Sequence, residues 1–182
     1  MPALNPAAPQ ATRATLHLSG QLRFVDDLLT TMSLLGTLGR FLSGLRSTGL
    51  LDVIKRRGPL TVFAPTDAAF EALPDAALAS LLAPDAGVAL RQTLRHHLVE
   101  GCLMARQVAG RTMVVQALDG SLLTLRGLPA LRVDQARWLR PDQGASNGVL
   151  HVIDAVLLPT LGRARSSAAL GGAAWPDQPA LR

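Results

Sequence analysis

Apolar side chains recur at helical spacing through the first third of the ordered part of the chain. Between residues 24 and 45 they fall every three or four positions, as on one face of an α-helix. Three glycines interrupt this stretch, which predicts two or three short helices rather than one long rod. Another helical segment begins at Leu50 and is expected to end before Gly58-Pro59.

The segment at residues 60–64, Leu-Thr-Val-Phe-Ala, is a short apolar run that predicts a buried strand. Pro65 is expected to end it, because proline has no N–H to donate to a sheet. Thr66 or Asp67 can then cap a helix over residues 68–73 by accepting from the free N–H groups of its first turn. Further helices are predicted over residues 77–82 and 88–98.

Beyond Gly101 the helical period gives way to the alternation that is typical of strands. Runs at residues 113–118 and 121–125 flank Asp119-Gly120. An Asp-Gly pair between two apolar runs predicts a hairpin in which both turn residues take positive φ.

The remaining chain predicts two more strand pairings. Residues 131–133 and 137–139 are expected to pair through a turn at Asp134-Gln135. Asn147-Gly148 makes another tight turn, and residues 149–158 read as a long final strand that ends at Pro159. Helices first and strands afterwards, with one early strand, predict an α+β domain.

The two ends of the chain differ in composition from its centre. Residues 1–20 are rich in Ala, Pro and Thr and are expected to form a disordered tail, and residues 162–182 form a second, low-complexity tail. The globular domain is therefore expected to occupy residues 21–161. A chain of 182 residues suits this plan of one domain with tails.

Composition limits the classes of function. Aromatic residues make up 3% of the chain and hydrophobic residues 48%, so the core must be mostly aliphatic. The net charge of +5 invites a nucleic acid partner, but the basic residues are scattered and aromatic stacking platforms are lacking, which argues against one. Cys102 is the one cysteine, so no internal disulfide forms. No transmembrane span and no secretory signal are visible in the sequence.

Three segments in order resemble the fasciclin domain family. They are TVFAPTDAAF at residues 61–70, LRHHLVEG at 94–101 and ASNGVLHVID at 145–154. The resemblance implies a wedge-shaped antiparallel β-sandwich with several helices packed along one edge. It also implies a set of structural signature residues: Thr61, Phe63, Pro65, Thr66, Asp67, Phe70, His97, Gly101, Asn147, Gly148, His151 and Asp154.

The middle segment departs from the family pattern at two positions. His96 stands where a tyrosine is usual, and Glu100 stands where a proline is usual. In animal relatives the tyrosine-histidine segment is implicated in integrin binding. Because that segment differs here, integrin recognition is not carried over to this chain.

The residues that invite chemistry have simpler structural interpretations. His97 is expected to bond to the backbone at the edge of the core, and His151 to be exposed or hydrogen-bonded at a turn. Asp154 is expected on the solvent side of the last strand or beside an arginine. Adjacent His96 and His97 would point about 100° apart on a helix, which disfavours a shared metal.

Nucleophile and phosphate sites are also disfavoured. Cys102 is expected to pack as a small hydrophobic residue. Ser146 lacks the glycine-flanked elbow of serine hydrolases and is better placed to stabilise the turn. Gly36 and Gly39 lie in an apolar stripe with no phosphate-loop lysine after them. The sequence therefore predicts no enzyme activity, no metal and no cofactor.

The leading hypothesis is a non-enzymatic adhesion or interaction module that binds a protein or a cell-surface or matrix polymer. The alternative is a carrier of a small apolar ligand, held in a pocket between helices and sheet. The family resemblance points to an extracytoplasmic location, in the periplasm, at the cell surface or secreted. Since no signal peptide is visible, a cytoplasmic location also stays open, as does the oligomeric state.

Overall fold

Helices come first along the chain, as the apolar spacing predicts. The computed structural model describes residues 26–82 and 87–159. Three short helices open it, α1 (Leu28–Leu35), α2 (Gly39–Ser47) and α3 (Leu50–Arg56). Gly36 ends α1 with a left-handed φ of 67°, so the first glycine interruption is a true helix stop. Phe24 and the predicted tails at 1–20 and 162–182 lie outside the described residues.

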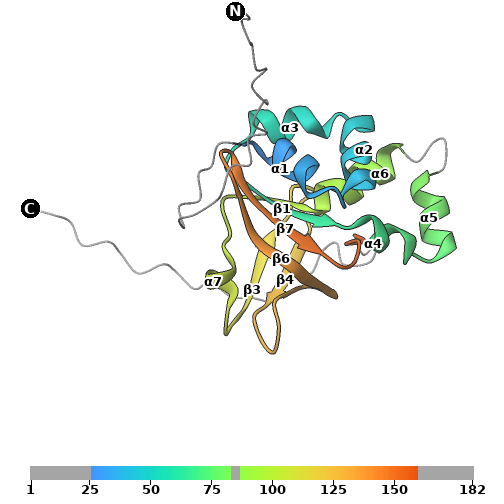
Figure 1. Ribbon diagram of the computed structural model, residues 1–182. Helices are drawn as coiled ribbons and strands as arrows, with labels where there is room; N and C mark the ends of the chain where they lie inside the picture. Colours follow the sequence, from blue (N-terminus) through green and yellow to red (C-terminus); the bar gives the residue numbers. More distant parts are fainter. Residues whose placement is uncertain (1–25, 83–86, 160–182) are drawn as a thin grey trace, which may run out of the picture.

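The strands form one seven-stranded sheet with helices between them (Figure 1). Its order is β2-β1-β7-β6-β5-β4-β3. The strands are β1 (Leu60–Pro65), β2 (Leu98–Glu100), β3 (Thr112–Gln116), β4 (Leu122–Arg126), β5 (Arg132–Val133), β6 (Ala136–Ala145) and β7 (Gly148–Ile153). The helices among them are α4 (Asp67–Glu71), α5 (Asp75–Leu82), α6 (Gly87–His96) and α7 (Ala105–Val108).

The α+β prediction is confirmed, and the pairing adds one feature that the sequence did not reveal. Strands β1 and β7 are parallel, whereas the other neighbours in the sheet are antiparallel. The sheet is therefore mixed and open. Its central parallel pair joins the start of the strand region to its end, which ties the domain together across most of its length.

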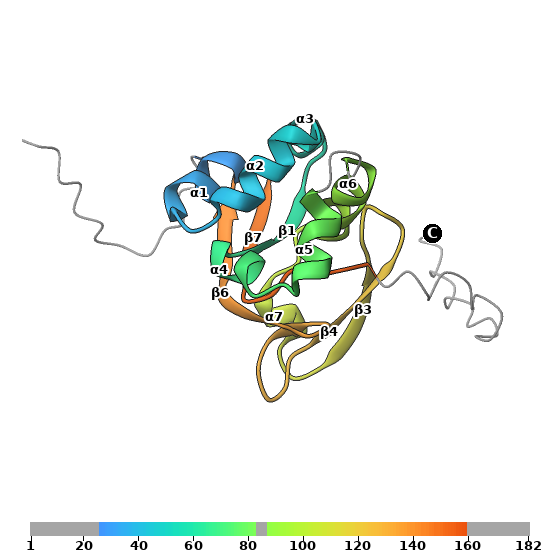
Figure 2. The same cartoon turned by 90° about the vertical axis from the view of Figure 1, so that its right-hand side faces the viewer.

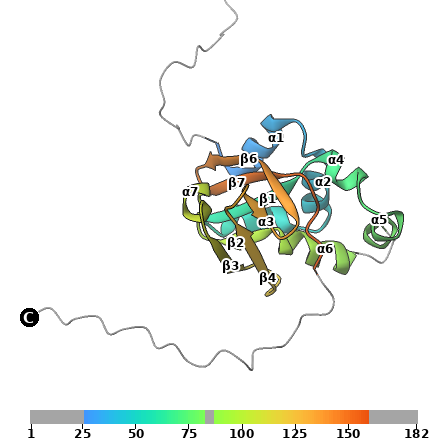
Figure 3. The same cartoon turned by 90° about the horizontal axis from the view of Figure 1, so that it is seen from below.

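The sheet bends into two halves around β6. This strand pairs with β5 near Arg137 and with β7 from Trp138 to Ala145, and its register shifts between Trp138 and Gln143. Such irregularities let a strand turn from one layer into another. Figures 2 and 3 show the outcome, with α1, α2 and α3 beside β1 and β7, and with β3 and β4 on the side away from those helices.

Two hydrophobic clusters fill the two sides of the central pair. One lies between β1–β7 and the helices and contains Val62, Ala64, Leu150 and Val152 with residues such as Phe41 and Leu45. The other lies between the two halves of the sheet and contains Phe63, Leu123, Leu125, Trp138 and Ile153. Both β1 and β7 are consequently buried on both faces, which explains their nearly continuous apolar sequence.

Three local predictions need correction. In the β3–β4 hairpin only Gly120 takes positive φ, at 90°, while Asp119 does not, so the turn is not the expected mirror-image type. The final strand ends at Ile153 and not at residue 158; Asp154, the next residue, still bonds to Arg137 of β6 through its backbone and its side chain. Cys102 is exposed rather than packed as a small hydrophobic residue.

Candidate functional site

The first and last signature segments lie side by side in the interior of the sheet, on its second and third strands. Strands β1 and β7 pair in unbroken register, from Leu60 opposite Gly148 to Pro65 opposite Ile153. Phe63 lies opposite His151, so the two segments share the interior of the fold. This pairing positions most of the signature residues.

Asn147 joins the sheet to two helices. Its side-chain oxygen accepts from the N–H of Leu28 at the start of α1 (2.8 Å), and its Nδ2 donates to the carbonyl of Ile54 in α3 (3.1 Å). Its own carbonyl accepts from the N–H of Leu60, where β1 begins (3.1 Å). One side chain thus satisfies a free helix N–H and a helix carbonyl that come from segments far apart in sequence.

We expect Asn147→Ala to lower the free energy of unfolding by about 2 kcal/mol, because it leaves two partly buried backbone groups without partners. Urea unfolding followed by circular dichroism would measure this. Asn147→Asp tests the contact with Ile54 separately. It keeps the acceptor for Leu28 but places a carboxylate against the Ile54 carbonyl, so it should also destabilise the fold. An alanine variant as stable as the parent would show that Asn147 does not join these elements.

His151 is fully buried, contrary to the expectation of an exposed or turn-bound side chain. Strand alternation does place it on the face opposite Leu150 and Val152, but that face is covered by the second half of the sheet. Its ring stacks on the ring of Trp138, with the two centroids 4.1 Å apart. The ring of Phe63 also stacks against His151, with the centroids 5.5 Å apart.

The hydrogen bonds of His151 fix its tautomer. Nδ1 accepts from the N–H of Asp142 (3.0 Å), so Nε2 carries the proton and donates to the carbonyl of Leu103 (2.7 Å). Burial lowers the pKa of His151, which keeps the ring neutral. Thr61 extends this network, because its hydroxyl donates to the Gly101 carbonyl and accepts from the N–H of Leu103.

His97 makes the backbone contacts that the sequence analysis expects. It is fully buried, its Nδ1 donates to the carbonyl of Thr93 (2.7 Å), and its Nε2 accepts from the N–H of Leu157 (3.0 Å). The ring therefore joins α6 to the segment after β7 and lies 5.6 Å from Phe41. Burial lowers the pKa of His97 to about 4.

Thr66 and Asp67 cap two different helices. Thr66 caps α4, since its hydroxyl accepts from the N–H of Ala69 (3.2 Å). Asp67 caps the start of α2 instead, and accepts from the N–H groups of Gly39 (3.2 Å) and Arg40 (2.7 Å). Sequence reasoning missed this second role, because the partners lie nearly thirty positions away.

The last two expectations concern Asp154 and Phe70. Asp154 accepts from the backbone N–H and from Nε of Arg137 (2.7 and 3.0 Å), so the arginine partner is present. Phe70 is buried and packs in the helix-side cluster. These residues, like Pro65 in β1, make contacts within the fold and have a structural role.

A polar triad that the sequence analysis did not identify joins α6 to the β3–β4 turn. Nδ1 of His96 lies 3.1 Å from a carboxylate oxygen of Asp119 and 2.6 Å from the Ser121 hydroxyl, which also contacts that carboxylate. Burial acts to raise the pKa of Asp119, but bonds from Ser121 and the nearby His96 outweigh it and lower that pKa. Serine and aspartate meet the same ring nitrogen, so this is not the relay of a serine hydrolase.

His97 and His151 therefore offer little to catalysis or metal binding. Both ring nitrogens of His97 and of His151 are occupied by the backbone. Among residues 26–82 and 87–159, no group of three or more His, Cys, Asp or Glu side chains is placed to hold a metal ion. In the same residues no helix has the length and apolar character needed to cross a membrane.

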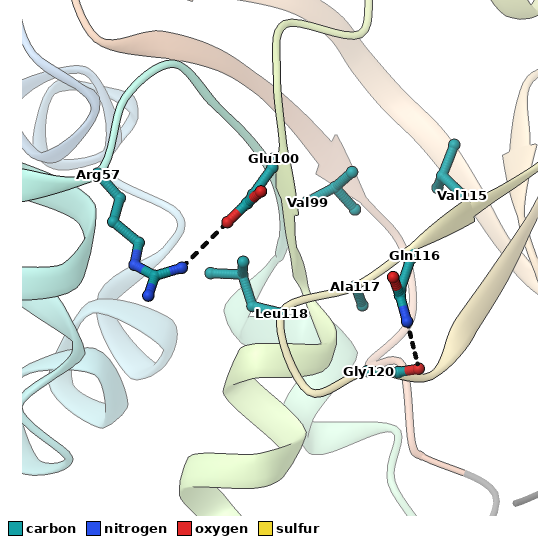
Figure 4. Close-up of a pocket in the computed structure, with 8 residues that line it drawn as sticks. All are labelled: Arg57, Val99, Glu100, Val115, Gln116, Ala117, Leu118 and Gly120. Atoms are coloured by element: carbon teal, nitrogen blue, oxygen red, sulfur yellow. Dashed lines mark hydrogen bonds and ion pairs between the residues drawn. The ribbon is translucent and has the colours of Figure 1, made fainter.

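An open groove lies where the two edge strands of the sheet approach each other (Figure 4). Val99 of β2 forms an isolated bridge with Ala117, the residue after β3, and the groove beside it has a volume of about 540 Å³. An ion pair between Arg57 and Glu100 (3.0 Å) spans one side. The apolar-ligand hypothesis calls for an enclosed pocket between helices and sheet, and this groove is neither enclosed nor in that place.

Comparisons with known proteins agree with the resemblance. The model of the fasciclin domain family matches residues 36–159. Protein sll1483 of Synechocystis sp. is 37% identical over 126 residues, which cover 69% of each chain. Protein sll1735 of the same organism is 35% identical over 112 residues, 62% of this chain and 82% of that one.

A solved structure shares the fold. A FAS1 domain pair from the insect cell adhesion molecule Fasciclin I aligns with a TM-score of 0.51 and 19% identity, over 67% of this chain and 45% of that chain. The family match covers both central strands and the three segments on which the resemblance depends. This chain belongs to the fasciclin domain family.

Proposed function

We propose that this chain is a non-enzymatic adhesion or interaction module that binds a component of a cell surface or extracellular matrix outside the cytoplasm. The observation that carries this proposal is an uncovered face of the sheet. On β3, β4 and β6 the inward side chains fill the core, while Val114, Leu122 and Leu139 point the other way and are 55%, 65% and 50% exposed.

This face has the make-up of a contact surface. Val114 and Leu122 are diagonal neighbours, since Val114 pairs with Thr124 and Leu122 with Gln116. Exposed apolar side chains grouped on a rigid sheet are typical of surfaces that bind partners. The signature residues, in contrast, are buried or bonded within the fold. A binding role therefore belongs to the outer surface, and the open groove gives the carrier hypothesis little support.

A capture experiment would test this role. The purified chain, immobilised, should retain a component from the cell envelope or culture medium of its host. We expect Val114→Ser/Leu122→Ser to reduce retention several-fold, because apolar contact area is lost. Leu34→Ser/Val88→Ser is the matched control, since both side chains are exposed on helices, at 74% and 72%. No captured component, or equal loss in both variants, would contradict the proposal. Fractionation of the host would test the location.

A further inference from the structure

Three arginines stand in a row across the same uncovered face. Arg126 of β4 lies directly opposite Arg132 of β5, and Arg132 lies directly opposite Arg137 of β6. Residues paired in this way project from the same side of an antiparallel sheet. Their alternating neighbours Leu125, Val133 and Ala136 are fully buried between the two halves of the sheet, so the arginines face outward.

Within the described residues, one arginine of this row forms an ion pair and two do not. Arg137 has Asp154 as an ion-pair partner (3.0 Å). Within residues 26–82 and 87–159, neither Arg126 nor Arg132 forms a salt bridge. Like charges directly opposite each other on neighbouring strands destabilise a sheet. Two such arginines without an ion-pair partner leave a cationic site on a rigid sheet.

We propose that this arginine row binds an acidic polysaccharide, a linear polymer with a carboxylate on successive sugars. The inference rests on the proposed function and names the partner class of that same face. Guanidinium groups bind carboxylates through paired hydrogen bonds. Neighbouring strands place the backbones of the arginines about 4.8 Å apart, a distance comparable with the length of one sugar ring.

The surroundings of the row also favour a sugar polymer over a single-stranded nucleic acid. Leu139 follows two residues after Arg137 on β6 and is half exposed, so it offers an apolar contact for the face of a sugar ring. Single-stranded nucleic acids are bound through aromatic platforms. In the described residues the phenylalanines and Trp138 are all buried, so the face presents no such platform.

Binding of the full chain to immobilised polygalacturonate, with neutral dextran as the reference polymer, tests the inference. We expect binding that weakens as salt rises, because exposed charges are screened. Arg126→Gln/Arg132→Gln should weaken it about fivefold to tenfold at low salt. The control Arg46→Gln/Arg91→Gln removes the same charge from two exposed helical positions and should change the affinity less than twofold.

Several results would overturn the inference. An equal loss of affinity in the two double variants would mean that binding depends only on net charge. Tighter binding to single-stranded DNA than to polygalacturonate would mean that the partner of this face is a nucleic acid. No binding to the acidic polymer, together with capture of another envelope component, would refute the inference and leave the proposed function intact. As a check on folding, Arg126→Thr should not lower the melting temperature, because it removes an opposed like charge.

Discussion

Replacing Gly148 by alanine is expected to destabilise the protein by about 4 kcal/mol or to prevent folding altogether. A Cβ at this position would overlap the carbonyl and the N–H nitrogen of Leu60. Leu60 cannot retreat, because its other side pairs with Glu100 of β2 and its N–H is bonded to the Asn147 carbonyl. The clash therefore falls on the central parallel pair of the sheet. Urea unfolding, or the yield of folded protein, would measure the effect.

Gly87→Ala provides the matched control. Gly87 is the first residue of α6, and a Cβ there would meet no atom within 4 Å. Alanine should be neutral or slightly stabilising, because it restricts the unfolded chain. A Gly148→Ala variant as stable as Gly87→Ala would mean that β1 and β7 are not in the close contact described above.

Much of the fold can be predicted from the sequence because its central strands are buried on both sides. The run at residues 60–64 and the start of the last strand are nearly all apolar, and such runs stand out against amphipathic helices. Turn residues then set the order of the elements. Strand β6 was harder to predict, because its second half contains Pro141, Asp142 and Gln143 and bends between the two halves of the sheet.

The site could be predicted only where its contacts are local. Thr66 caps the helix that follows it, so its role can be inferred from neighbouring positions. The caps made by Asp67 and Asn147, and the contact of His96 with Asp119, join residues between 23 and 119 positions apart. The error for His151 has the same origin. Alternation gives the face on which a side chain lies, but not whether a second layer of the fold covers that face.

We expect the protein to lose about 3 kcal/mol of stability as pH falls from 6.5 to 4, because of His97 alone. Burial lowers its pKa from 6.5 to about 4 in the folded state. Nearby His96 acts in the same direction, while the Thr93 carbonyl and Asp119 oppose it. Between these values the unfolded chain binds a proton that the folded chain does not. Stability is therefore complete above pH 6.5 and declines toward pH 4.

His151 adds to this loss, because burial lowers its pKa as well. Asp27 and Asp119 have pKa values lowered below 3.8, so they stay ionised in this window and lose their contribution only at lower pH. Acid destabilisation between pH 6.5 and 4 therefore reports mainly on His97 and His151. Urea unfolding at several pH values measures the slope, and the ring resonances of His97 should show a neutral imidazole at pH 5.

Variants separate the two contributions. His97→Gln should be less stable than the parent at pH 7, since it disturbs the bonds to Thr93 and Leu157, but its stability should fall less steeply with acid. His151→Asn should flatten the remaining slope in the same way. If the parent slope persisted in both variants, or if His97 titrated near 6.5, the protons would be binding elsewhere. The contact that His97 makes between α6 and the segment after β7 would then be accessible to water, because the ring stays neutral at pH 5 only when it is buried away from water.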